Sequence, residues 1–154
     1  MKPPRLNGMT EFIHPGGCHC GAIRYDFVTS QDLDAVVPRQ CGCSFCVRQG
    51  ARYASDPSGR LEISVKDVTL LGRYRFGHKT ADFMFCRSCG VMPVVTCELD
   101  GRLYGIVNVN TLDGAERIAT PQHLHDYEGE AGTNRLARRK KNWIATVVFI
   151  QSDL

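Results

Sequence analysis

Seven of the eight cysteines in the chain fall into three short groups, and this clustering constrains the fold more than any other feature. The groups are Cys18 and Cys20 in "GGCHCG", Cys41, Cys43 and Cys46 in "CGCSFC", and Cys86 and Cys89 in "FCRSCG"; Cys97 stands alone. The opening residues contain no apolar run typical of an export signal, so we expect a reducing, cytoplasmic setting in which lasting disulfides are rare. Clustered thiols in such a protein indicate metal binding or chemistry at sulfur.

The residues between and around the thiols favour zinc. Thiolate-only ligand sets suit Zn²⁺, iron–sulfur clusters and Cu(I), and redox-silent, tetrahedral zinc is the preferred interpretation for a scaffold ligand. The C-x-x-C pair is followed by Gly90, which predicts a tight turn that aims both sulfurs at one metal. The C-x-C pair also lies in a glycine-flanked turn. Two such pairs can close a Cys₄ site, although their spacing does not say which pairs combine.

The number of clustered thiols predicts two unequal sites. Seven ligands divide into four and three, and the triplet Cys41, Cys43 and Cys46 is compact enough to hold a metal by itself. A zinc with three protein ligands keeps a fourth position for water or substrate, which distinguishes catalytic from structural zinc.

Two other interpretations of the cysteines stay open at this point. In the first, His123, His125 or Cys97 closes the second site and makes it structural. In the second, "CRSC" is a redox motif, although it lacks the βαβ context that such motifs need.

The rest of the chain predicts a mainly β protein made of short antiparallel strands. Alternating and β-branched runs between turn signals are typical of strands at 22–28, 60–65, 68–76, 81–85, 91–99, 102–110 and 143–150. A helical turn is expected after Cys46 and a helix over 133–141. The length of 154 residues suits a single domain, which we expect over 16–154 after a flexible leader at 1–15. No apolar stretch is long enough to span a membrane.

Four segments of the chain are informative together: "GGCHCGAIRYDF", "CGCSFCVRQGA", "FCRSCGVMP" and "VNVNTLDG". From about Gly16 to His125 the chain resembles the glutathione-dependent formaldehyde-activating family, which also includes centromere protein V. This resemblance implies a β-tent fold with two zinc ions. Cys18, Cys20, Cys86 and Cys89 would hold the structural zinc, and Cys41, Cys43 and Cys46 an open, catalytic zinc.

The resemblance also implies an activity. The family is named for joining formaldehyde and glutathione to S-(hydroxymethyl)glutathione, the reverse of a carbon–sulfur lyase reaction. The expected partners are therefore a glutathione-like thiol and a small aldehyde. The chain departs from the family at 128–142, "EGEAGTNRLARRKKN", which precedes Trp143 and leaves the true substrates open.

Cationic residues offer candidates for substrate binding. Arg48 and Arg52 follow the cysteine triplet and are expected to orient a carboxylate, with a solvated surface position as the alternative. The basic run 135–141 is interpreted as a solvated face, or as a contact for an acidic partner. The formal charge of +3 would fall to zero with seven thiolates and two Zn²⁺, so a nucleic-acid partner is not expected.

Two non-enzymatic functions compete with this one. The chain could be an interaction module with two structural zincs that binds protein or nucleic acid through 135–141, or a metal store or sensor. The sequence does not predict an oligomeric state or a role for Cys97.

Overall fold

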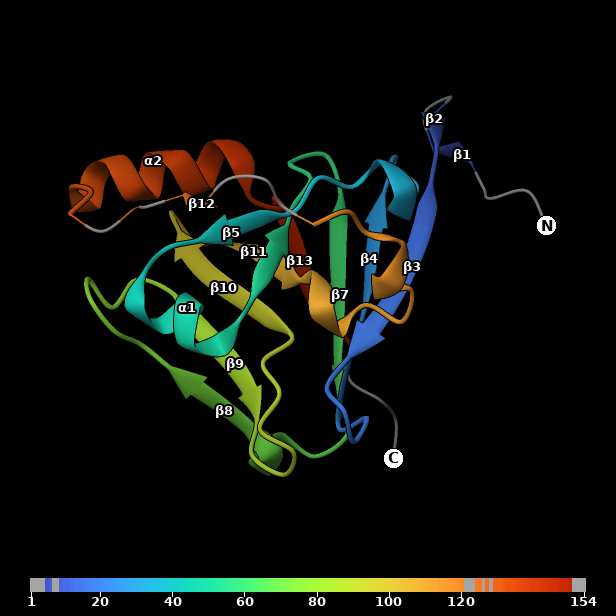
Figure 1. Ribbon diagram of the computed structural model, residues 1–154, viewed down its shortest axis with the longest axis horizontal. Coiled ribbons are helices and arrows are strands. Elements are labelled where there is room, and N and C mark those ends of the chain that lie inside the picture. The colour runs from blue at the N-terminus through green and yellow to red at the C-terminus, as the bar shows by residue number, and fades with distance from the viewer. Residues whose placement is uncertain (1–4, 7–8, 121–123, 126, 128, 151–154) are drawn as a thin grey trace.

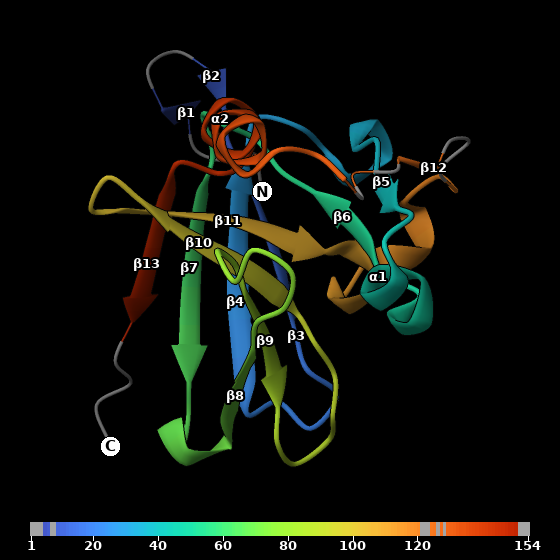
Figure 2. The same cartoon turned by 90° about the vertical axis from the view of Figure 1, so that its left-hand side faces the viewer.

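The structure is a computed structural model, and it describes residues 5–6, 9–120, 124–125, 127 and 129–150. Two β-sheets dominate it (Figures 1 and 2). The larger has seven strands in the order β12 (Leu124–His125), β5 (Arg39–Cys41), β6 (Arg52–Ala54), β11 (Arg102–Asn108), β10 (Val94–Leu99), β9 (Asp82–Cys86) and β8 (Leu71–Tyr74). The smaller has the order β13 (Thr146–Ile150), β7 (Arg60–Val65), β4 (Ile23–Thr29) and β3 (Phe12–Gly17). A two-stranded ribbon joins β1 (Arg5–Leu6) and β2 (Met9–Thr10).

Helical segments are short apart from one. They are α1 (Ser44–Gln49), α2 (Gly132–Asn142) and four 3₁₀ turns, η1 (Leu33–Ala35), η2 (Val68–Leu70), η3 (Val109–Thr111) and η4 (Ala115–Arg117). Figure 1 shows α2 along one end of the molecule. None of the helices among the described residues has the length and hydropathy needed to cross a membrane.

The core forms because the inward faces of both sheets are apolar. Ile23, Tyr25 and Phe27 alternate along β4 and are almost fully buried. They pack with side chains from β7, β9, β10 and β11 in one cluster. A second cluster lies under α2 and contains Tyr104 and Trp143. The predicted mainly β class is confirmed.

Strand bounds follow the sequence prediction closely where the apolar pattern is long. Every predicted segment contains a strand, and 133–141 falls within α2. The predicted boundary at residue 16 falls inside β3, which begins at Phe12 and pairs with β4 over its whole length. Residues 12–15 therefore belong to the sheet rather than to a leader. The helix expected after Cys46 begins earlier, at Ser44, because Cys43 caps its N-terminus.

Candidate metal centres and the adjoining cavity

Four cysteines from distant parts of the chain converge on one point. Cys18 and Cys20 lie in the turn between β3 and β4, and Cys86 and Cys89 lie where β9 ends. Their four sulfurs are all within 4.8 Å of one another. The Sγ atoms of Cys20 and Cys86 are 3.5 Å apart, and those of Cys18 and Cys20 are 3.8 Å apart. Sulfurs bound to one tetrahedral zinc at about 2.3 Å lie about 3.8 Å from one another, so this cluster has the spacing of a Cys₄ site.

Backbone geometry holds the four thiols in place. The Ile23 N–H donates to Cys18 Sγ at 3.2 Å, and the Ser88 N–H donates to Cys86 Sγ at 3.4 Å. Gly90 has a φ of +80°, which a residue with a side chain rarely adopts, and it lets the chain turn directly after Cys89. Burial raises the pKa of Cys18 to about 11, so this thiol is a poor nucleophile by itself and needs a cation to ionise. The four-thiol cluster is suited to a structural metal.

The triplet forms a second, separate cluster around the start of α1. Cys41 ends β5, Cys43 is the N-cap of α1, and Cys46 lies within the helix. Their sulfurs lie within 4.8 Å of one another. The Cys43 N–H points at Cys41 Sγ at 3.5 Å, and the Cys46 N–H points at Cys43 Sγ at 3.4 Å. Three thiols therefore present their sulfurs to one point, as a metal with three protein ligands requires.

The protons of the triplet are shared unequally. A hydrogen bond from the Cys46 thiol lowers the pKa of Cys41 to about 6, whereas the same bond and burial raise the pKa of Cys46. Negative charge therefore collects on a cluster that a cation would neutralise.

None of the three proposed internal donors completes the triplet among the residues that the structure describes. Cys97 is 2% exposed and lies in β10, outside both clusters. His125 pairs with Cys41 in the parallel β12–β5 register, but it is exposed and its ring stacks on Tyr127, with the ring centroids 6.0 Å apart. His123 lies outside the described residues. All eight cysteines are free thiols, and the "CRSC" pair belongs to the four-thiol cluster.

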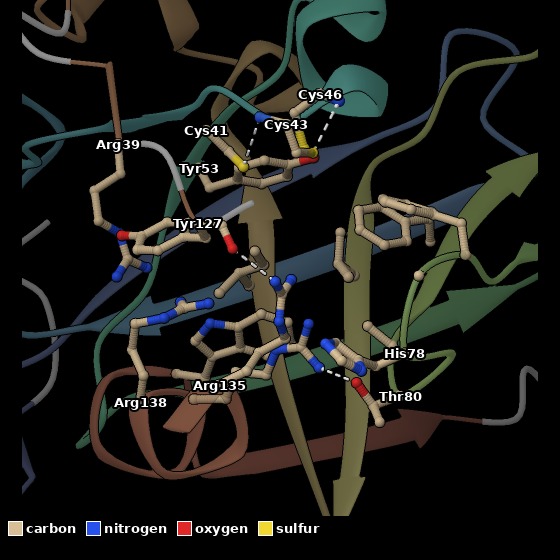
Figure 3. Close-up of a pocket in the computed structure, with 18 of the residues that line it drawn as sticks. Arg39, Cys41, Cys43, Cys46, Tyr53, His78, Thr80, Tyr127, Arg135 and Arg138 are labelled. Atoms are coloured by element: carbon tan, nitrogen blue, oxygen red, sulfur yellow. Dashed lines mark hydrogen bonds between the residues drawn. The ribbon is translucent and has the colours of Figure 1, made fainter. Parts of the chain in front are cut away.

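The triplet opens onto a cavity of about 370 Å³. Figure 3 shows Cys41, Cys43 and Tyr53 at one end of this cavity and the α2 arginines at the other. Apolar and aromatic side chains form much of the wall between them, including Phe76, Phe83, Val95, Ile106 and Trp143. The four-thiol cluster contributes no residue to this lining, so of the two candidate metal centres the triplet is the one that borders the cavity.

Tyr53 lies against the triplet and is 4% exposed. Its hydroxyl also lies 3.2 Å from Cys46 Sγ. The hydroxyl can thus donate to the sulfur when Cys46 is ionised.

The arginines expected at the site lie elsewhere. Arg48 is exposed and donates to the Ser44 carbonyl oxygen at 2.9 Å. Arg52 donates to Asn110 Oδ1 at 2.8 Å. Neither residue is among those that line the cavity.

Four other arginines line the cavity. They are Arg39 from β5 and Arg135, Arg138 and Arg139 from α2. The interpretation of 135–141 as a solvated face is therefore wrong for Arg139, which is 6% exposed, whereas Lys140 and Lys141 are exposed as expected. Of the four, the sequence singles out only the three in the basic run 135–141, and not as cavity residues.

Comparison with known proteins places the chain in a family. The sequence profile of the glutathione-dependent formaldehyde-activating enzyme matches residues 13–129. The chain belongs to this glutathione-dependent formaldehyde-activating family. A crystal structure of a Rhodobacter sphaeroides protein from a structural genomics programme is similar at 31% sequence identity, covering 73% of this chain and 98% of that one, with a TM-score of 0.49.

The family match separates the site into two parts. All seven clustered cysteines, together with Arg39 and Tyr53, lie inside the residues matched by the formaldehyde-activating family. The three arginines of α2 and Trp143 lie beyond them. The α2 side of the cavity is thus formed by residues outside the matched range.

Proposed function

We propose that this protein is a zinc-dependent enzyme of the carbon–sulfur lyase kind, which joins glutathione or a similar thiol to a small aldehyde. The observation that carries the proposal is the difference between the two thiol clusters. One has four converging sulfurs, and the other has three and faces a cavity. In this proposal the first holds a structural zinc and the second an open one.

The residues around the cavity support this chemistry. When bound by Cys41, Cys43 and Cys46, zinc would supply a soft Lewis acid that accepts an incoming thiol as its fourth ligand and lowers the thiol pKa. The apolar wall of Phe83, Val95 and Ile106 excludes water from the reacting groups. The thiol sulfur forms a bond to the aldehyde carbon, the carbonyl π bond breaks, and the proton lost by the thiol ends on the carbonyl oxygen.

Cobalt substitution tests the proposal. Co²⁺ reports its ligands in the visible spectrum, so we expect addition of glutathione to shift the bands of the protein with both sites loaded. Cys43→Ser should abolish the shift and retain one tightly bound metal. Cys97→Ser, which removes a cysteine outside both clusters, should retain two metals. A Cys43→Ser protein that keeps two metals and a full response to glutathione would exclude the assignment.

The same spectra separate this proposal from a non-catalytic zinc module. If His125 supplies a fourth ligand, the wild-type spectrum will ignore thiols and His125→Ala will create a response. That result would make the second site structural and would end the enzymatic interpretation.

A further inference from the structure

The guanidinium of Arg139 is buried at the α2 end of the cavity. It is 6% exposed, donates from Nη1 to Thr80 Oγ1 at 2.7 Å, and lies 3.6 Å from Cys97 Sγ. Its Cζ lies 5.0 Å from the centre of the Trp143 ring, and its Nε has no hydrogen-bond partner. Burial lowers its pKa. A buried cation needs an anion and full hydrogen bonding to be tolerated, and the contacts found here supply neither completely.

The carboxylate of Glu130 lies against the other arginines of α2 and is not paired with Arg139. Glu130 pairs with Arg138, with oxygen and nitrogen 3.1 Å apart, and lies 3.7 Å from Arg135 Nε, too far for a hydrogen bond. Arg135 donates from Nη2 to the Tyr127 carbonyl oxygen at 2.7 Å, while its buried Nε has no hydrogen-bond partner. None of the described lining residues is acidic. Arg135 and Arg139 therefore each keep an N–H donor without an acceptor at the same end of the cavity.

We infer that the cavity selects a substrate that carries a carboxylate, and that Arg135 and Arg139 determine this selectivity. The inference rests on the proposed function for the identity of the reacting group, a thiol. Guanidinium groups present planar, paired donors that match a carboxylate and form charge-assisted hydrogen bonds with it. A thiol with a carboxylate at its far end would place its sulfur at Cys41, Cys43 and Cys46 and its anion beside α2 (Figure 3).

Helix α2 lies outside the part of the chain that the family profile matches, which ends at residue 129. Trp143, which ends the helix, packs in the second core cluster and fixes the helix end against the sheet. The arginines are therefore held by a folded element and positioned before a ligand arrives.

Fluorescence provides a binding measurement that does not depend on catalysis. Trp143 is the single tryptophan of the chain, and it lines the cavity next to Arg139. The probes are 3-mercaptopropionate and 3-mercaptopropanamide, which have nearly the same size and differ in the negative charge. We expect the zinc-loaded protein to bind the carboxylate at least about tenfold more tightly, as a charge-assisted hydrogen bond requires.

Variants that each remove one positive charge test whether the preference for the carboxylate depends on the two arginines. Arg139→Gln and Arg135→Gln should each reduce the preference for the carboxylate about tenfold, with circular dichroism confirming the fold. Arg135 is 20% exposed at its side chain, so its variant remains informative if Arg139→Gln fails to fold. Lys141→Gln removes the same charge from an exposed position of α2 outside the cavity lining and should keep the full preference.

A second pair of probes separates the failure of this inference from that of the proposed function. 3-(Methylthio)propionate and its amide carry no ionisable sulfur, so a preference for the acid depends on the arginines alone. The inference is wrong if the acid and amide forms bind equally in both probe pairs. It is also wrong if Lys141→Gln lowers the preference for the acid as much as Arg139→Gln does. In either case the proposed function still stands if the cobalt protein responds to thiols. If the cobalt protein ignores every thiol and Trp143 still reports tighter binding of the methylthio acid, the proposed function fails and the carboxylate site stands.

Discussion

The Tyr53 hydroxyl lies 3.2 Å from Cys46 Sγ and connects strand β6 to the thiol cluster of helix α1. Burial raises the pKa of Tyr53, so this hydroxyl stays protonated at neutral pH. It can therefore donate to a Cys46 thiolate at all pH values at which a metal would be bound. A donor of this kind orients the ligand and stabilises its charge.

Tyr53→Phe should weaken metal binding at the triplet about tenfold, because it removes one hydrogen bond to a charged sulfur. Competition with a chromophoric chelator measures this affinity. The four-thiol cluster should keep its affinity in the same protein. Tyr25→Phe is a matched control, since its hydroxyl bonds to Thr111 Oγ1 at 2.8 Å, away from both clusters. Equal losses in the two variants would show that the hydroxyl of Tyr53 acts only through packing.

The two clusters should contribute unequally to stability. A metal held by Cys18, Cys20, Cys86 and Cys89 links segments more than sixty residues apart, with Cys20 and Cys86 separated by 66 positions. The triplet closes only the short loop from Cys41 to Cys46, so it removes less entropy from the unfolded chain. We expect Cys20→Ser to lower the free energy of unfolding by about 3 kcal/mol or more, a fraction of the binding energy of structural zinc.

Cys43→Ser should have a smaller effect, of about 1 kcal/mol, for the same reason. Urea unfolding of the metal-loaded proteins, with metal content measured in parallel, gives both values. A larger loss for Cys43→Ser than for Cys20→Ser would contradict the assignment of the four-thiol cluster as the structural one.

The strands that could be predicted are those with enough residues to show a pattern. β4 and β7 are six or more residues long and alternate buried and partly exposed positions over five of them, and the sequence shows this period directly. β5 and β6 have three residues each and carry or flank the triplet. Three residues do not define a period, and these strands form because β11 and β12 pair with them from distant parts of the chain.

The triplet could be predicted because its ligands are close in sequence, and the joining of Cys18 and Cys20 with Cys86 and Cys89 came from the family resemblance, whereas the arginines could not be predicted. Arg52 adjoins Tyr53 on β6, and neighbouring residues of a strand point to opposite faces, so Tyr53 faces the cavity and Arg52 does not. The burial of Arg139 depends on Thr80 and Trp143, which the fold brings around it. A basic run on a helix has no local signal for such burial.

Gly16→Ala should destabilise the fold by about 1–3 kcal/mol, the usual cost of overpacking. A Cβ at Gly16 would lie 2.6 Å from the Thr111 carbonyl oxygen and 2.6 Å from Cζ of Tyr25. The first of these atoms is backbone and cannot rotate away. Thermal unfolding measures the loss. Gly132→Ala is the matched control, because its nearest neighbour, His78 Nδ1, would lie at an ordinary 3.6 Å and alanine favours the helix. A Gly16→Ala protein as stable as the wild type would mean that η3, which contains Thr111, can move away from β3 at little cost.

Asp82 should make stability depend on pH in the acidic range. Its side chain is 13% exposed and pairs with both Arg73 and Arg75. The hydrogen bond from Arg75 lowers its pKa below that of the unfolded chain, which is about 3.9. A depressed carboxyl pKa stabilises the fold above the unfolded pKa, and this contribution is lost as the pH falls through the folded value.

Asp82→Asn should therefore cost up to about 1 kcal/mol at pH 7, the usual range for a partly exposed ion pair, and less at pH 2, where more of the carboxyl group is protonated. Urea unfolding of the wild type and the variant at each pH gives the difference, in which metal loss common to both proteins cancels. Asp100→Asn is the control, because Asp100 is 85% exposed at its side chain and lies 3.6 Å from Lys140. It should not change stability at either pH, since solvent screens that pair. A constant cost of Asp82→Asn from pH 7 to pH 2 would show that Asp82 acts through packing in β9 rather than through its charge.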